Sequence, residues 1–230
     1  KFTFILLLFF HALFATFLFF IANTEILSNF HNGDGLWWFA ADGVQYQREA
    51  LRSLQFLQNS EWANWWNAYA THSQIKFVSL SYWITGYEKQ LAFEVVNGLV
   101  WTVSVVLVYR SSKVLFENNT VVPILTVLFF LQPSVLISST QLLRDPIILL
   151  AVCFLCYGWV LISKTELHRR AVLYIVIGLL LYISMRQYLG MIVVGVFSLY
   201  LVYLLLKSKI NILNTAIILL STLLIINLNS

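Results

Sequence analysis

The sequence predicts an all-α polytopic membrane protein with about seven transmembrane helices and a long, partly helical first external loop. Of the 230 residues, 60% are hydrophobic and only 10% are charged, whereas about a quarter of the residues in a soluble domain are charged. The apolar residues form long uncharged runs, each near the length that crosses a bilayer. These observations exclude a soluble protein, and we expect no nucleic-acid partner although the net charge is +4.

Seven runs have the length and apolar character of spanning helices. They cover residues 2–22, 91–109, 121–138, 146–163, 171–185, 189–206 and 210–227. The fifth run is short, and it spans the bilayer only if Arg186 at its end reaches the head groups or a polar cavity. Pro133, near the end of the third run, is expected to bend or end that helix. Residues 1–230 are expected to form a single transmembrane module, and the start at Lys1 leaves open that the module is a piece of a longer chain.

The basic residues divide the connections between these runs into two classes. If the amino terminus is cytoplasmic, the cytoplasmic side holds a clear excess of basic residues over acidic ones. The basic residues there are Lys1, Arg110, Lys113, Lys164, Arg169, Arg170, Lys207 and Lys209, and the acidic ones are Glu117 and Glu166. Because cytoplasmic loops are enriched in Lys and Arg, we expect the amino terminus in the cytoplasm.

One connection, residues 23–90, is far longer than the others and falls on the external face. It contains six of the eight tryptophans and no proline. Aromatic rings of this density are typical of a segment at the level of the lipid head groups, where a ring buries one face and keeps a polar edge wet. We expect two helices lying near the membrane plane, over residues 42–58 and about 61–73.

The acidic residues of this loop are the first candidates for chemistry. Asp34 lies between two glycines, and Asp42 opens the sequence D-G-V-Q-Y-Q-R-E-A. On a helix, Asp42, Tyr46 and Glu49 share one stripe. The alternative is that Asp42 only caps the start of the helix.

Charged residues at the boundary of the spans are the second group of candidates. Arg144 and Asp145 lie in a polar external turn, and Arg186 ends the fifth run. Glu94 could form a carboxylate pair with Asp34 or Asp42, suited to acid–base chemistry or to a divalent cation. The alternatives are ion pairs that hold helices together, contacts with head groups, or packing of Glu94 against a partner helix.

Three other features have structural interpretations. His11, in the middle of the first run, is expected to be a hydrogen-bonded residue between helices. Cys153 and Cys156 are expected to be packed thiols in an apolar span rather than a redox or metal site. The sequence contains no zinc-protease, serine-hydrolase, P-loop or dinucleotide motif, so it identifies no cofactor with certainty and leaves a divalent cation open.

In its order of segments the chain resembles the conserved transmembrane module of the GT-C superfamily of membrane glycosyltransferases, especially bacterial members related to protein mannosyltransferases and aminoarabinose transferases. The motifs that carry the resemblance are Asp42, Tyr46 and Ala50, and the run from Pro133 to Asp145. The resemblance implies a location in the bacterial inner membrane and an inverting transfer of a sugar from a polyprenyl-phosphate donor to a glycan, lipid or protein acceptor at the external face.

The resemblance also implies roles for individual residues. Asp42 would be the base or would position the acceptor, with Asp34 as the alternative acid, because many members carry a further acidic residue where this chain has Gly43. Cations are needed near the departing phosphate, where negative charge grows. The residues expected to contact the substrate are Tyr46, Glu49, Lys89, Glu94, Arg144, Asp145 and Arg186.

Two other functions remain open from the sequence. A polysaccharide polymerase or ligase would also need external arginines for a lipid diphosphate, although its long external loop is usually later in the chain. A non-catalytic subunit of a membrane complex or transporter would use the aromatic loop as a docking belt between the bilayer and other membrane subunits.

The predicted topology can be tested by single cysteines at Arg110, Lys164, Lys207 and Trp62. Because the positive-inside rule places the first three in the cytoplasm, a membrane-impermeant thiol reagent added outside the cell should label only the cysteine at position 62. Strong labelling from outside at position 110 or 164 would overturn the assignment of the faces.

Overall fold

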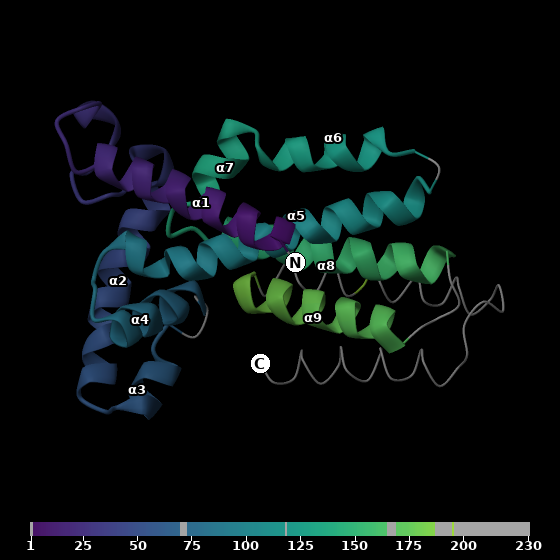
Figure 1. Cartoon of the computed structure of the whole chain (residues 1–230). Helices are drawn as coiled ribbons and strands as arrows, with labels where there is room; N and C mark the ends of the chain where they lie inside the picture. Colours follow the sequence, from purple (N-terminus) through teal and green to yellow (C-terminus); the bar gives the residue numbers. More distant parts are fainter. Residues whose placement is uncertain (1, 70–72, 118, 165–168, 187–194, 196–230) are drawn as a thin grey trace. The chain divides into compact units, whose positions relative to one another are not determined.

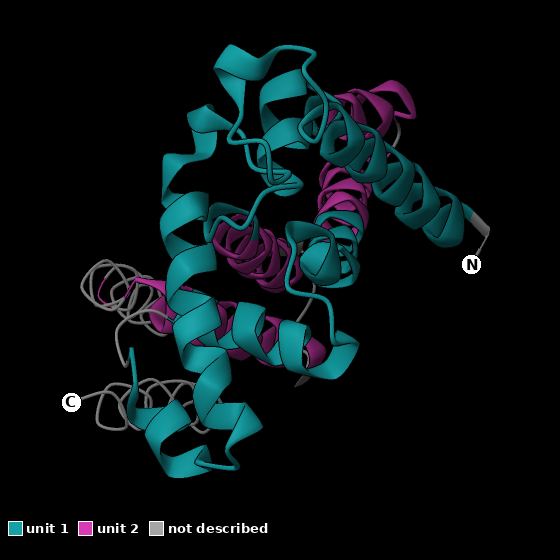
Figure 2. Ribbon diagram, turned by 90° about the vertical axis from the view of Figure 1, so that its left-hand side faces the viewer, with its two compact units in different colours: residues 1–103, 129–146 teal, residues 104–128, 147–230 magenta. Residues whose placement is uncertain are grey.

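The computed structural model describes residues 2–69, 73–117, 119–164, 169–186 and 195, and within these ranges the chain is helical without strands (Figure 1). It forms two compact units. Unit 1 comprises Lys1–Val103 and Phe129–Pro146, and unit 2 comprises Ser104–Leu128 and Ile147–Ser230 (Figure 2). Each unit therefore contains segments that are far apart in the sequence.

Within the described residues, three helices are long and apolar enough to cross a membrane. They are α1 (Phe2–Ile21), α5 (Glu94–Leu115, preceded by the 3-10 turn η3, Gln90–Phe93) and α8 (Asp145–Lys164). Their mean hydropathies are 2.6, 2.0 and 2.3. The protein is thus an integral membrane protein by the length and composition of its helices.

The third predicted span is broken rather than continuous. Helices α6 (Val121–Phe130) and α7 (Pro133–Ser139) meet at an angle of 55°. Pro133 is the first residue of α7, where the absence of its N–H does not interrupt a helical hydrogen bond. The expected bend at this proline is confirmed, and the pair counts as a fourth span only if both helices are taken together.

The remaining predicted spans differ in how far the structure describes them. The fifth corresponds to α9 (Arg169–Met185), which is apolar but shorter than the other candidates. The predicted spans 189–206 and 210–227 lie outside the described residues. The second span also runs further than expected, since α5 continues past Arg110 to Leu115. In this last part of the helix the hydroxyls of Ser111 and Ser112 donate to the carbonyls of Leu107 and Val108.

In its described residues, the long loop contains three α-helices instead of the expected two. Helix α2 (Ala41–Gln58) agrees with the predicted 42–58. The predicted helix at 61–73 is wrong in extent, because α3 (Trp62–Asn67) ends after six residues. A further helix, α4 (Ser73–Thr85), was not expected. Serines and a lysine interrupt its apolar pattern, so burial against α2 rather than a clear periodicity determines that it is helical.

The core of unit 1 lies between α2 and α4. Tyr46, Ala50 and Leu54 follow one another at four-residue intervals on α2, which places them on one face. They pack against a matching face of α4. The buried residues of this cluster are Leu36, Tyr46, Ala50, Leu54, Ile75, Val78, Tyr82, Ala92, Phe93 and Leu142. Burial raises the pKa of the Tyr82 phenol, assisted by the nearby carboxylate of Glu88, so this ring stays neutral.

Helix α3 is tied to α4 by its tryptophans. The Trp65 indole donates a hydrogen bond to Ser79 Oγ at 3.0 Å. The Lys76 ammonium donates to the Trp66 carbonyl at 2.5 Å and lies 4.8 Å from the centre of the Trp66 ring. Burial lowers the pKa of Lys76. These contacts join α3 to α4 and leave the indoles of Trp62, Trp66 and Trp83 exposed.

Unit 2 contains a close approach of α8 and α9. A Cβ at Gly178 would lie 2.9 Å from the Ala151 carbonyl oxygen, and one at Gly158 would lie 3.0 Å from the Ala171 carbonyl oxygen. Small residues allow helix backbones to pack this closely in membranes. Leu155, Ile175, Leu179 and Ile183 fill the space beside the contact.

This packing predicts that alanine at either glycine of the contact destabilises the protein. Alanine normally favours a helix over glycine by about 1 kcal/mol, but in Gly158→Ala and Gly178→Ala the added methyl meets a backbone carbonyl that cannot rotate away. The melting temperature in detergent should fall for both variants.

Gly98→Ala is the matched control, because its nearest neighbour is the flexible end of Leu8 at 3.0 Å. Its melting temperature should change little. Equal stability of all three variants would contradict the close contact between α8 and α9.

Candidate functional site

The candidate site is built around the start of α2 in unit 1. The helix begins at Ala41, and Ala40 precedes it without a side-chain cap. Asp42 therefore is not the helix cap that the sequence allowed as an alternative; it lies within the first turn and is exposed. Its carboxylate has no polar side-chain partner in the described part of the chain, while the helix dipole favours negative charge at this end.

The glycine-flanked loop before α2 presents Asp34 to Lys89. The Asn32 side-chain carbonyl accepts hydrogen bonds from the backbone N–H groups of Asp34 and Leu36, at 2.9 and 3.1 Å. This turn directs Asp34 outward, where the Lys89 ammonium donates to its carboxylate at 2.5 Å. Two candidate residues that are 55 positions apart are thus paired. Because both are substantially exposed, the pair contributes at most about 1 kcal/mol.

The two sequence motifs of the candidate site meet at Gly43. A Cβ at this position would lie 3.7 Å from the Leu142 backbone nitrogen, and Leu142 belongs to the same buried cluster as Tyr46. The D-G motif of α2 is therefore in contact with the turn that leads to Arg144 and Asp145. Arg144 is half-buried, and Asp145 is exposed at the first turn of α8.

Hydrogen bonds fix this turn to its surroundings. Gln141 accepts the Trp37 backbone N–H on its side-chain oxygen at 3.2 Å, and its own carbonyl accepts from the Asn97 amide at 3.0 Å. The Gln90 amide donates to the Thr140 carbonyl. The turn thus connects the long loop of residues 23–90 to the start of α5.

Tyr46 and Glu49 have different surroundings, although they are three residues apart on α2. Tyr46 is 5% exposed and belongs to the core, so its ring packs rather than faces a substrate. Glu49 is half-buried and accepts a hydrogen bond from the Gln45 amide at 2.8 Å.

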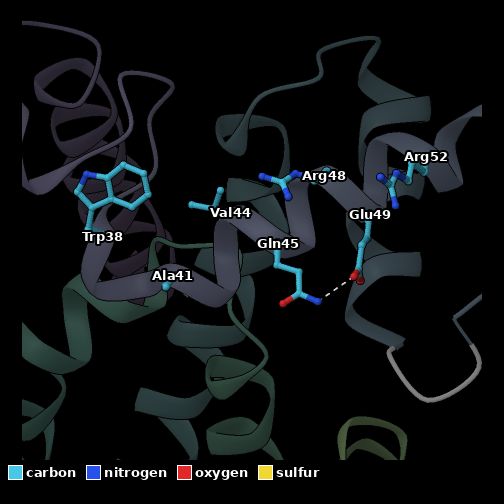
Figure 3. A pocket seen from close by; sticks show the side chains of 7 residues that line it. All are labelled: Trp38, Ala41, Val44, Gln45, Arg48, Glu49 and Arg52. Carbon is cyan, nitrogen blue, oxygen red and sulfur yellow. Dashed lines mark hydrogen bonds between the residues drawn. The ribbon is translucent and has the colours of Figure 1, made fainter.

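Glu49 lines an open pocket of about 370 Å³ on the outer side of α2 (Figure 3). The lining residues are Trp38, Ala41, Val44, Gln45, Arg48, Glu49 and Arg52. Arg48 and Arg52 are absent from the sequence-based set of candidates. Their four-residue spacing within the predicted helix 42–58, on the side away from Tyr46 and Leu54, is the signal that could have identified them.

Glu94 is bound in a buried polar network instead of pairing with Asp34 or Asp42. Its Oε1 lies 2.6 Å from His11 Nδ1, and the other ring nitrogen of His11 lies 2.7 Å from Ser139 Oγ. The three residues come from α1, α5 and α7 and are all buried. The expectation that His11 is a hydrogen-bonded residue between helices is confirmed. The network connects three helices and gives Glu94 a structural partner.

The remaining residues belong to unit 2. Arg186 follows α9. Cys153 and Cys156 are free thiols on α8, of which Cys153 is buried, as expected for a packed thiol, and Cys156 is exposed. Among the residues that the structure describes, no three His, Cys, Asp or Glu side chains come together to hold a metal ion.

The buried network predicts a non-additive pair of substitutions. Glu94→Ala leaves the His11 imidazole buried without its partner, and removal of one member of a buried pair typically costs about 3–5 kcal/mol. Replacement of both by leucine removes the polar groups together and should cost less. The melting temperatures of Glu94→Ala and of the double variant His11→Leu/Glu94→Leu test this order; a lower stability of the double variant would contradict it.

Comparisons with protein-family models, with curated proteins and with solved structures find no significant match for this chain.

Proposed function

We propose that this protein is a membrane glycosyltransferase that moves a sugar from a polyprenyl-phosphate-linked donor to an acceptor at the external face of a bacterial inner membrane. The observation that carries the proposal is the contact between Gly43 and Leu142. It joins the acidic first turn of α2 to the turn before Arg144, and these are the two segments whose residues suggest this chemistry.

Asp42 is the better of the two candidate acids. Its carboxylate is exposed and free of polar side-chain partners within the described residues, on a helix that the α2–α4 core holds in place. The carboxylate of Asp34 is paired with the Lys89 ammonium, which occupies one of the oxygens that would have to accept the proton of an acceptor hydroxyl. A general base must be ionised and within reach of the proton that it removes.

The proposed reaction is a single displacement. The acceptor hydroxyl oxygen attacks the anomeric carbon of the sugar, and Asp42 takes the hydroxyl proton. The bond from the anomeric carbon to the phosphate oxygen breaks, and its electron pair leaves with the polyprenyl phosphate. A carboxylate in this role contributes about 10²- to 10⁴-fold to the rate.

A docking subunit is the second candidate function. The indoles of Trp62, Trp66 and Trp83 are 47%, 65% and 44% exposed, and Trp62 and Trp83 are in contact at 5.4 Å between ring centres. Such a cluster also suits a helix of another membrane protein. This function requires no carboxylate at Asp42.

Asp42→Asn separates these possibilities. The variant keeps the shape of the side chain and removes the charge, so it should fold normally and lose about a hundredfold or more of sugar transfer from a polyprenyl-phosphate donor. The measurement is the transfer of labelled sugar by membranes that contain equal amounts of folded wild-type protein or variant.

Asp34→Asn is the matched control, because it removes an exposed charge from the same loop. It should retain most of the activity. Loss in Asp34→Asn alone would move the role of the base to Asp34. Full activity of both variants would contradict the carboxylate mechanism. If the wild-type protein itself transfers no sugar, that result would favour the docking function.

A further inference from the structure

The pocket on the outer side of α2 is a feature that the carboxylate mechanism does not use. All its lining residues except Trp38 belong to one helix, and Trp38 comes from the 3-10 turn directly before it. The opposite side of the helix is fixed in the core by Tyr46, Ala50 and Leu54. The core therefore fixes the helix backbone from which the side chains of the pocket project.

Two arginines in the pocket are without an acidic partner. Arg48 and Arg52 are exposed, and within the described part of the chain neither takes part in a hydrogen bond or an ion pair. Residues four apart on a helix lie on the same side. Two guanidinium groups on one side of a helix favour a bound anion, and phosphate matches the forked donor geometry of arginine.

The one carboxylate in the pocket is held by a neighbour rather than by the arginines. The Gln45 amide donates to Glu49 Oε1 at 2.8 Å, and Figure 3 shows the Glu49 side chain turned toward Gln45. The pocket thus keeps an excess of one positive charge. A carboxylate and an amide beside a phosphate site are suited to the hydroxyl groups of a sugar, since both accept hydrogen bonds from them.

Trp38 gives the pocket an apolar wall. Its side chain is 51% exposed although the residue before it, Trp37, is buried. An exposed indole next to charged groups suits a ligand with both apolar and polar parts, and tryptophan is the residue typical of the boundary between lipid and water.

We propose that this pocket binds the glycosyl phosphate head group of a polyprenyl-linked lipid, with Arg48 and Arg52 as ligands of the phosphate, Gln45 and Glu49 as partners of the sugar hydroxyls, and Trp38 against the apolar side of the ligand. The identity of the lipid rests on the proposed function. The assignment gives the phosphate to Arg48 and Arg52 rather than to Arg144 or Arg186.

The test is a binding measurement that needs no turnover. The purified full chain is placed in phosphatidylcholine nanodiscs alone, or in nanodiscs that also contain phosphatidylglycerol, polyprenyl phosphate or polyprenyl-phosphate glucose. Bound lipid is counted by native mass spectrometry after release from the disc. Wild-type protein should retain polyprenyl-phosphate glucose in preference to phosphatidylglycerol.

Single charge removals identify the ligands of the phosphate. Arg48→Gln and Arg52→Gln should each weaken binding of polyprenyl phosphate, with and without glucose, by about tenfold or more, because each loses a charge-assisted hydrogen bond. Arg110→Gln removes an arginine that is also exposed but lies outside the pocket, and it should leave binding unchanged. Unchanged binding in Arg48→Gln and Arg52→Gln, or an equal loss in Arg144→Gln alone, would overturn the assignment.

Glu49→Ala tests the sugar part of the proposal. It should weaken binding of polyprenyl-phosphate glucose and leave binding of sugar-free polyprenyl phosphate unaffected or stronger, because it also removes a negative charge from the pocket. Equal retention of phosphatidylglycerol and polyprenyl-phosphate glucose by the wild-type protein would identify a general site for anionic lipids and overturn the glycosyl specificity.

The result of the binding measurement does not depend on whether Asp42 is the catalytic base. Asp42→Asn should bind polyprenyl-phosphate glucose like the wild-type protein, since Asp42 does not line the pocket. Binding without any transfer by the wild-type protein would leave the site intact and reject the proposed reaction. Transfer with no effect of Arg48→Gln or Arg52→Gln on binding would retain the reaction and reject the site.

Discussion

The apolar contact between α2 and α4 is the constraint that organises the long loop of residues 23–90. Because Tyr46, Ala50 and Leu54 must be buried against α4, the orientation of α2 about its own axis is fixed. Arg48 and Arg52 then face outward. The chemistry on the surface of α2 is thus set by which of its residues the core requires, and loss of this core would remove both the exposed acid and the arginine pocket at once.

Among the candidate spanning helices, hydrogen bonds between buried polar side chains have a similar organising effect. An apolar surface between membrane helices gives little specificity, since lipid is as apolar as leucine. His11, Glu94 and Ser139 instead offer one arrangement in which the buried polar groups satisfy each other. Gln141 does the same for the turn between α7 and α8, where it meets Trp37 and Asn97. These contacts fix the positions of the helix ends from which the candidate residues project.

Features with a strong local signal could be predicted from the sequence. The extent of α2, the bend at Pro133 and the hydrogen-bonded role of His11 follow from periodicity, proline geometry and the cost of a polar group in a span. Helix α4 could not be predicted, because its serines and Lys76 hide the apolar face that α2 buries. The pairing of Asp34 with Lys89 and the contact of Gly43 with Leu142 depend on tertiary packing over long separations, which no local pattern records.

The break between α6 and α7 also limits how much hydrocarbon this part of the chain can cross as one continuous helix. Helix α6 has ten residues, so it covers about 15 Å, half of a hydrocarbon layer of about 30 Å. At its end Gln132 and Ser134 are exposed, and hydrocarbon cannot solvate an amide or a hydroxyl. If α6 and α7 cross the membrane as one span, the break therefore places two polar side chains where only water, head groups or another helix can hydrogen-bond them.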